Sequence, residues 1–347
     1  MPKVLDVFNQ ATVLQYINDR EIAPGLGETL FPSIKIDTLE LEYVKGANEA
    51  PIVASVHAFD SEAEIGDREG FEVIRQELAL IKRKIQMKEK LIIALQNPRT
   101  PAELQSTVQK IYDDVDAMIT SVLTKVEQMR FEALATGKLV FSENGFSGTI
   151  DYGVPADHKT TLLTTDLWSD ALATPLEDLQ TWFDKIVADT GIAPQRILTS
   201  GRVASALQKH ASVRSAIHGV NSDRVVSRTQ LNEFLVEQGL PTIATEDRVY
   251  RVKGSNGAYT TKRYFPDNVL VMMPGGVLGN AVYGPTAEEI QLSSDPSVDI
   301  SKVGNVVATV YNTNDPVAHW TKAVATALPS FPTANQVFLA TVLAASV

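Results

Sequence analysis

Histidines and carboxylates are the side chains that most often bind metals or transfer protons, and this sequence holds five histidines. They form no HExxH motif and no pair at the spacing of metal ligands. His210 and His218 would lie two turns apart on a single helix, but neither has a carboxylate four residues away. We therefore expect surface or capping histidines rather than ligands. The full set is His57, His158, His210, His218 and His319.

Three aspartates cluster at Asp113, Asp114 and Asp116. Their oxygens suit a divalent cation, but the solvated face of a helix explains them more simply. No GxSxG motif is present, so a serine hydrolase triad is not supported. The sequence Gly275-Gly276-x-x-Gly279 has the wrong glycine spacing for a dinucleotide loop, and no helix is expected after it. We expect a loop between strands there, and a protein that is not an enzyme and has no cofactor or metal.

One basic cluster stands out in a sequence with few charge runs, and it comprises Lys82, Arg83, Lys84, Lys88 and Lys90. Lys82, Lys84 and Lys88 are the candidate site residues, because they lie close enough together to face DNA or an acidic neighbour. The alternative is an ordinary solvated face shared with Glu89.

Composition limits the remaining function classes. The chain has 347 residues, is 44% hydrophobic and carries a net charge of −11, which suits a soluble globular protein and argues against a dedicated nucleic-acid binder. It has no cysteine, so disulfides and thiolate metal sites are absent. We expect no signal peptide, because Asp6, Asn9 and Gln10 interrupt any apolar core near residue 1, and no apolar run approaches the roughly 18 residues of a membrane helix.

The clearest element that the pattern predicts is one very long helix over residues 100–136. Thr100-Pro-Ala-Glu103 forms a capping box with proline at the first helical position, and Gly137 supplies the end. Apolar residues recur every three or four positions between them, and the helix would span about 50 Å. The stripe consists of Leu104, Val108, Ile111, Val115, Met118, Val122, Val126, Met129 and Ala133.

Strands are expected on both sides of this helix. Apolar and polar residues alternate over 34–43 with one phase slip, which predicts a strand. A second strand is expected at 51–59, and residues 60–70 should form an acidic, exposed loop tip. Residues 71–95 fit a helical stripe slightly better than one strand face, so periodicity alone leaves a helix and a strand open there. A hairpin follows at 139–152, with its turn at Asn144-Gly145.

From residue 174 the pattern alternates between helices and strands. Capping boxes open at Thr174 and Ser227, and glycines end the helices. The helices are predicted at 174–190, 201–217 and 227–238, and the strands at 196–200, 242–245, 248–253, 269–273, 305–311 and 337–343, with a hairpin through 254–257 and mixed structure at 316–327.

The segment from Arg263 to Glu289 combines a turn at Pro266-Asp267-Asn268, the buried strand at 269–273, the glycine-rich crossing and a break at Gly284-Pro285. This order, with "PGG.LG" and "YGPT.E", resembles the major capsid protein E family of tailed bacteriophages, the lambda type. The stretch from Asn314 to Trp320 ahead of the final strand also resembles the end of that family. The resemblance extends over nearly the whole chain.

The resemblance implies an α+β Hong Kong 97 phage-capsid-like fold, and within residues 71–95 it favours a returning strand around 80–87 followed by a short helix, which we adopt. It also places the parts of that fold on this sequence. These parts are an N-terminal arm (1–33), an E-loop hairpin (34–80), a P-domain (81–164) with spine helix 100–136 and hairpin 139–153, an α/β A-domain (165–300), and C-terminal strands (301–347) that return to the P/A-domain body.

The implied function is a major capsid protein that self-assembles, as pentamers and hexamers, into an icosahedral shell around double-stranded DNA. A separate scaffolding protein is implied because no long coiled-coil extension precedes the arm, and a portal and a decoration protein are further expected partners. DNA contact would be weak and nonspecific, and no membrane is involved. The protein would belong to the virion after assembly in the host cytoplasm. The alternatives are an encapsulin-like nanocompartment and an α+β hydrolase or transferase with an unrecognised site.

Overall fold

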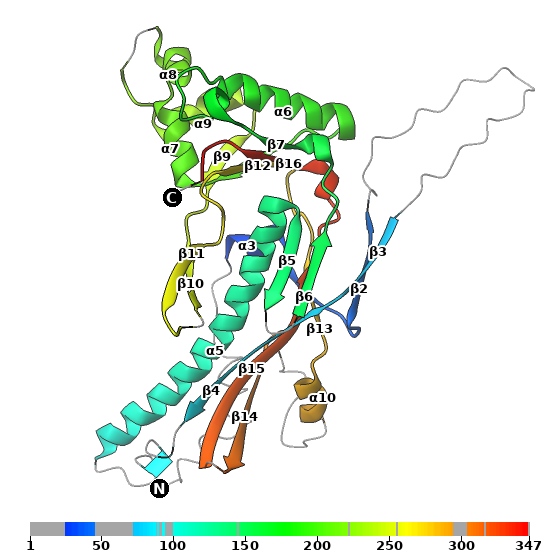
Figure 1. The fold of residues 1–347 in the computed structure, drawn as a ribbon, viewed down its shortest axis with the longest axis vertical. Coiled ribbons are helices and arrows are strands. Elements are labelled where there is room, and N and C mark those ends of the chain that lie inside the picture. The colour runs from blue at the N-terminus through cyan, green and yellow to red at the C-terminus, as the bar shows by residue number, and fades with distance from the viewer. Residues whose placement is uncertain are drawn as a thin grey trace, which may run out of the picture. The chain divides into compact units, whose positions relative to one another are not determined.

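A computed structural model describes residues 25–45, 72–87, 89, 92–93, 100–143, 146–220, 223–254, 256–293, 304–315 and 317–345 (Figure 1). The strand predicted at 51–59 and the loop tip predicted at 60–70 lie outside these residues. The chain divides into two compact units. The first comprises residues 1–41, 75–130 and 280–330, and the second comprises residues 42–74, 131–279 and 331–347.

A five-stranded sheet forms the centre of the first unit. Its strands are β1 (Ser33–Lys35), β4 (Ala79–Met87), β13 (Ala281–Gly284), β14 (Val307–Asn314) and β15 (Val317–Pro329). β15 pairs with β4 along one edge, while β14 and then β13 pair with successive halves of its other edge. β1 lies parallel to β13. Figure 1 shows β4, β15 and β14 side by side.

β15 corrects the mixed structure predicted for 316–327, because it is one continuous strand. Its small side chains Ala323, Ala325 and Ala327 are fully buried. Alanine has low strand propensity, and only pairing with strands from distant parts of the sequence makes this run extended. The single strand predicted at 34–43 is also wrong, since β1 and β2 (Glu40–Lys45) are separate strands, and β2 pairs with β3 (Glu72–Glu77).

The long helix is confirmed as α5 (Pro101–Thr136). Its predicted apolar stripe is buried from Val115 onwards, as the burial of Val122, Val126 and Met129 shows. Gly137 ends the helix with a φ of 69°, and its N–H donates to the carbonyl oxygen of Ala133 at 2.9 Å. The strand preferred over a helix around 80–87 is also confirmed by β4, and residues 89, 92 and 93 after it are helical.

The second unit contains a five-stranded sheet in the order β7-β16-β12-β8-β9. The bounds are β7 (Lys159–Thr161), β8 (Arg196–Thr199), β9 (Thr242–Thr245), β12 (Val269–Met273) and β16 (Phe338–Thr341). The central strand β12 is antiparallel to both of its neighbours, and its residues Leu270, Val271 and Met272 are fully buried. Side chains on both faces of β12 are thus buried, as its continuous run of apolar residues predicted.

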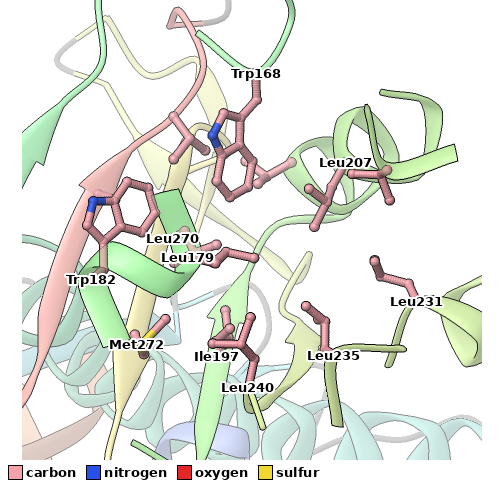
Figure 2. Close-up of a cluster of buried hydrophobic side chains, with 14 of the residues drawn as sticks. Trp168, Leu179, Trp182, Ile197, Leu207, Leu231, Leu235, Leu240, Leu270 and Met272 are labelled. Carbon is pink, nitrogen blue, oxygen red and sulfur yellow. The ribbon is translucent and has the colours of Figure 1, made fainter. Parts of the chain in front are cut away.

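Helices α6 (Pro175–Thr190), α7 (Gly201–Lys209), α8 (Ala211–His218) and α9 (Arg228–Glu237) belong to the same unit. Their apolar residues pack with Leu270 and Met272 of the sheet in one core cluster (Figure 2). Trp168 stacks on Trp182 at 5.9 Å between ring centres, and Trp182 stacks on Phe338 at 5.3 Å. Hydrophobic burial of these large side chains is the main stabilising term for the unit.

Two predictions about these helices are corrected. The helix predicted at 201–217 is divided into α7 and α8, because His210 adopts an extended conformation (ψ 137°) and its side chain caps α8 by accepting from the N–H of Ser212. Thr174 precedes α6 as predicted but forms no side-chain cap. The capping box at Ser227 and Gln230 is present on α9, as predicted.

Two hairpins complete the second unit. β5 (Lys138–Glu143) pairs with β6 (Phe146–Asp151), so the hairpin predicted at 139–152 is confirmed, with its turn residues outside the described part. β10 (Val249–Lys253) pairs with β11 (Tyr259–Arg263), which confirms the hairpin through 254–257. Within the described part of the chain, no helix combines the length and the apolar character needed to cross a membrane.

Candidate functional site

The candidate lysines Lys82 and Lys84 lie on β4 of the first unit, and both are exposed. Lys88, the third candidate, lies outside the described residues. Because side chains alternate along a strand, Lys82 and Lys84 project from the same face of the sheet, while Arg83 projects from the other. The structure therefore brings two of the three candidates together on one sheet face.

A third lysine joins this face through strand pairing. Lys322 of β15 lies directly opposite Lys84, and like charges at that position repel each other. The Lys84 ammonium lies 4.4 Å from the centre of the Trp320 ring, where the electron-rich face attracts a cation. Trp320 in turn stacks on Tyr311 of β14 at 6.3 Å between ring centres. We call Lys82, Lys84, Tyr311, Trp320 and Lys322 the lysine face.

Acidic residues of α10 (Ala287–Ser293) neutralise part of this face. Lys322 Nζ lies 2.5 Å from a carboxylate oxygen of Glu288, and Lys35 of β1 pairs with Glu289 at 2.5 Å. Burial of the Glu288 carboxyl opposes its ionisation, but the hydrogen bond from Lys322 and the charges of Lys322 and Lys82 keep its pKa below the ordinary value. Because Glu288 neutralises Lys322, Lys82 and Lys84 remain as the exposed cations of the lysine face.

A buried ionic cluster lies elsewhere in the first unit, where the N-terminal segment meets α5. Arg130 pairs with Glu127 at 3.1 Å and with Glu28 of α3 (Leu26–Leu30), and it donates to the Ser33 hydroxyl at 2.9 Å. Glu127 also accepts the N–H of Gly27 at 3.0 Å. We call Glu28, Glu127 and Arg130 the arm cluster, because it joins residues 25–35 to the long helix.

The histidines do not all match the surface or capping roles that the sequence predicted. His210 caps α8 as expected, but His158 is 1% exposed. Its Nδ1 lies 3.1 Å from the Val337 carbonyl oxygen, and its Nε2 lies 2.9 Å from a carboxylate oxygen of Asp189. Asp157, His158 and Asp189 could together offer ligand atoms to a metal. However, the Lys185 ammonium already lies 2.6 Å from Asp157 and 2.8 Å from Asp189, so the group is better explained as a salt-bridge network.

The glycine-rich segment is a loop after β12, as predicted, rather than a dinucleotide site. A Cβ atom at Gly275 would lie 2.0 Å from the side-chain oxygen of Gln195, and Gly276 has a φ of 78°. Arg196 donates to the Pro274 carbonyl at 3.0 Å and also contacts the Gly276 carbonyl. These glycines therefore permit close packing of the backbone.

The three clustered aspartates lie on α5. Asp113 is exposed and accepts from Gln109 at 3.0 Å, which suits the predicted solvated helix face. Asp114 is half-buried, and this burial, reinforced by the charge of Asp113, raises its pKa. No second observation points to a cation there.

A second cationic group, in residues 248–264, was not predicted from the sequence. Residues 248–264 contain five lysines and arginines and no acidic residue, but these cations are spaced too widely in the sequence to stand out as a cluster. The pairing of β10 with β11 brings them together on one hairpin. A count of charges in a window of this size, rather than a search for adjacent lysines, would have found them.

The comparisons with known proteins identify the family. The family model for phage major capsid protein E matches residues 9–342 of this chain. The chain belongs to this family. It is a phage major capsid protein, a structural component of the virion, as the order of segments in the sequence predicted.

Solved structures show the fold of this capsid protein. One similar structure is that of a protein assigned as the capsid protein of a prophage of Escherichia coli CFT073. It has a TM-score of 0.59 and 16% identity, and the match covers 96% of this chain and 97% of that one. Another is a phage-related protein from Bordetella bronchiseptica RB50, with a TM-score of 0.54, 10% identity and coverage of 94% and 95%. The predicted α+β Hong Kong 97 fold is thereby confirmed. No curated protein matches this capsid protein significantly.

Proposed function

We propose that this capsid protein forms pentamers and hexamers that close into an icosahedral shell around double-stranded phage DNA. The observation that carries the proposal is the match to the capsid family over residues 9–342. Shell closure requires one chain to present several surfaces to its copies, and extended elements such as α5 and the sheet around β15 suit this requirement.

The parts of the chain take the following roles in the proposal. Residues 1–33 form the N-terminal arm, 34–80 the E-loop, 81–164 the P-domain, 165–300 the A-domain, and 301–347 the returning C-terminal strands. The arm cluster supports a fixed junction between the arm and the long helix, because a buried ion pair restricts the geometry of the elements that contribute to it.

The remaining partners are proposed from the same role. A separate scaffolding protein directs assembly in the host cytoplasm, a portal occupies one vertex, and a decoration protein binds the outer surface. The protein acts by association and has no enzymatic activity of its own. Packaged DNA makes weak, nonspecific contact with the shell, since a net charge of −11 opposes tight binding of phosphate.

Lys82, Lys84 and Lys88 contribute a DNA-facing or subunit-contacting surface in this proposal. Its support is the exposure of Lys82 and Lys84 on one sheet face, next to the aromatic pair of Trp320 and Tyr311. Aromatic rings beside exposed cations suit both a nucleic acid and a protein partner.

Expression of the protein with its scaffold, followed by electron microscopy, tests the main proposal. Closed shells or rings of five and six subunits are expected, whereas a stable monomer with and without scaffold would contradict it. Shells that enclose enzymes rather than DNA would favour the nanocompartment alternative. The variant with Lys82, Lys84 and Lys88 changed to Gln then tests the lysine face, and it should alter nonspecific DNA retention or assembly yield. Unchanged values of both would remove the role of these lysines.

A further inference from the structure

The β10–β11 ribbon has no cover within the described part of the chain. Every residue of β11 is exposed, and of β10 only Tyr250 is half-buried. The two strands form a sheet of their own, and Figure 1 shows them as a ribbon that continues away from the sheet containing β9 and β12. An isolated two-stranded ribbon is only marginally stable in water, so its strands gain stability from contact with another surface.

The base of this ribbon is nevertheless firmly held. The Arg248 guanidinium donates to both oxygens of the buried carboxylate of Glu246, from Nε to Oε1 at 2.9 Å and from Nη2 to Oε2 at 3.0 Å. Its guanidinium group also lies 5.4 Å from the centre of the Tyr264 ring and 5.7 Å from that of Phe131. Such a planar, two-pronged contact fixes the direction in which a strand leaves.

β11 is anchored at the same end of the ribbon as β10. Asp247 pairs with Arg263, and its carboxylate accepts the N–H of Gly201 at the start of α7 at 3.0 Å. Tyr250 packs on Tyr264 with ring centres 4.9 Å apart. Both strands are thus fixed at one end, so the distal half of the ribbon is held in a defined direction before any partner binds, which lowers the entropy cost of association.

The distal half is cationic and partly apolar. Arg251, Lys253 and Lys262 are exposed, and the structure gives none of the three an ion pair among the residues it describes. Strand pairing puts Lys253 directly opposite Tyr259, so a cation and an aromatic ring share one face. Tyr259 is 61% exposed and Val252 is 36% exposed on the opposite face.

We infer that the β10–β11 ribbon is an assembly arm that binds an acidic, partly apolar surface on a second copy of this chain. The inference rests on the proposed self-assembly and adds the segment that mediates it. Residues 248–264 carry five positive charges, of which Arg248 and Arg263 are paired with Glu246 and Asp247, so the other three are left for a partner. The whole chain has a net charge of −11 and is therefore acidic outside this ribbon. A second copy therefore offers complementary charge.

The apolar side chains distinguish a protein partner from DNA. A phosphate backbone is bound by cations and hydrogen-bond donors, and exposed valines would gain nothing from it. Val249 is 53% exposed, and together with Tyr259 and Val252 it provides apolar area that a protein surface can bury. DNA is accordingly the alternative that the test has to exclude.

Carbodiimide crosslinking of assembled particles tests the inference directly. Particles are made from a mixture of ¹⁴N- and ¹⁵N-labelled full-length protein, and mass spectrometry then separates links between copies from links within one copy. We expect Lys253 or Lys262 to be joined to an Asp or Glu of another copy. Shells in which these lysines link only within their own chain, or not at all, would overturn the inference while leaving the proposed shell intact.

Charge reversal provides the second readout. Arg251→Glu/Lys253→Glu should lower the yield of shells at least tenfold. The control Arg228→Glu/Lys209→Glu makes the same charge change at an exposed arginine of α9 and an exposed lysine of α7, and it should assemble normally. Equal yields from both variants would overturn the inference. Normal assembly of the ribbon variant with a specific loss of DNA retention would instead assign the ribbon to nucleic acid. A wild-type protein that forms no shells would overturn the proposed function and the ribbon's role with it.

Discussion

Arg130 and Glu127 lie one turn apart on α5 and form an ion pair at 3.1 Å whose side chains are only 6% and 10% exposed. Two charges removed from water in this way are costly unless each has further partners. Glu28 and the Ser33 hydroxyl supply them for Arg130, and the N–H of Gly27 supplies one for Glu127. The further partners of the pair therefore come from the N-terminal segment. The conformation of that segment should accordingly depend on the pair.

Arg130→Met should destabilise the protein strongly, by about 3–5 kcal/mol, because it leaves the carboxylates of Glu127 and Glu28 without a counter-charge. Denaturant unfolding measures the change. The control is Lys138→Met, which removes a pair with Asp151 whose side chains are about half exposed, and it should cost less than about 1 kcal/mol. Similar losses for the two variants would mean that the arm cluster is not energetically buried.

Gly27→Ala should also disturb the arm cluster, although it changes no charge. A Cβ atom at this position would lie 2.4 Å from a carboxylate oxygen of Glu127, so that side chain would have to move away from Arg130. We expect a loss of about 1–3 kcal/mol in the free energy of unfolding, as for other overpacked sites. The matched change Gly148→Ala places its Cβ in open space and should have little effect on packing. Equal stability of Gly27→Ala and the wild type would contradict the close approach.

The two sides of α5 should respond differently to substitution. Val122→Ala removes two methyl groups from a site that is 1% exposed, and about 2–3 kcal/mol of stability should be lost. Asp114→Asn on the polar side should leave stability at pH 7 unchanged or slightly higher. A larger loss from Asp114→Asn than from Val122→Ala in the same urea titration would show that the apolar stripe is misassigned.

The same Asp114 variant has a defined pH dependence. Burial raises the pKa of Asp114 above 3.8 in the folded state, so the folded protein binds this proton more tightly than the unfolded chain does. The wild type therefore loses stability as the pH rises through the folded-state pKa of Asp114. Any gain in the free energy of unfolding from Asp114→Asn should appear above that pKa and vanish below pH 3.8. A stability gain of Asp114→Asn over the wild type that grows at low pH would contradict a raised pKa of Asp114.

Glu288→Gln should reveal the acid sensitivity of the pair with Lys322. The pKa of Glu288 lies below 4.5 in the folded state, so its ionised form stabilises the fold above pH 4.5, and this contribution is lost as the pH falls through the folded-state value. The variant should be less stable than the wild type at pH 7, and thermal unfolding between pH 7 and pH 3 should show the two converging in acid. A difference that is independent of pH would mean that the Glu288 charge is not involved.

Sequence periodicity and capping residues determined much of the secondary structure. The spacing of Val115, Val122 and Val126 and the position of Gly137 were sufficient to define α5, and Ser227 with Gln230 defined the start of α9. These signals act between residues within about one helical turn, so they are present in the sequence itself. The order of segments at 263–289 was likewise sufficient to indicate the capsid family.

Tertiary structure alone decided which side chains from distant parts of the sequence meet. Lys84 and Trp320 are more than 200 positions apart, and only the register of β4 on β15 brings the ammonium to the ring. His210, at the break between α7 and α8, also places a ring nitrogen 2.9 Å from the Asp170 carbonyl oxygen, a contact that no helical periodicity encodes. The ribbon cations likewise gather only when β10 pairs with β11. Local patterns fix helices because their interactions are local, whereas charge clusters on sheets depend on strand pairing across distant sequence.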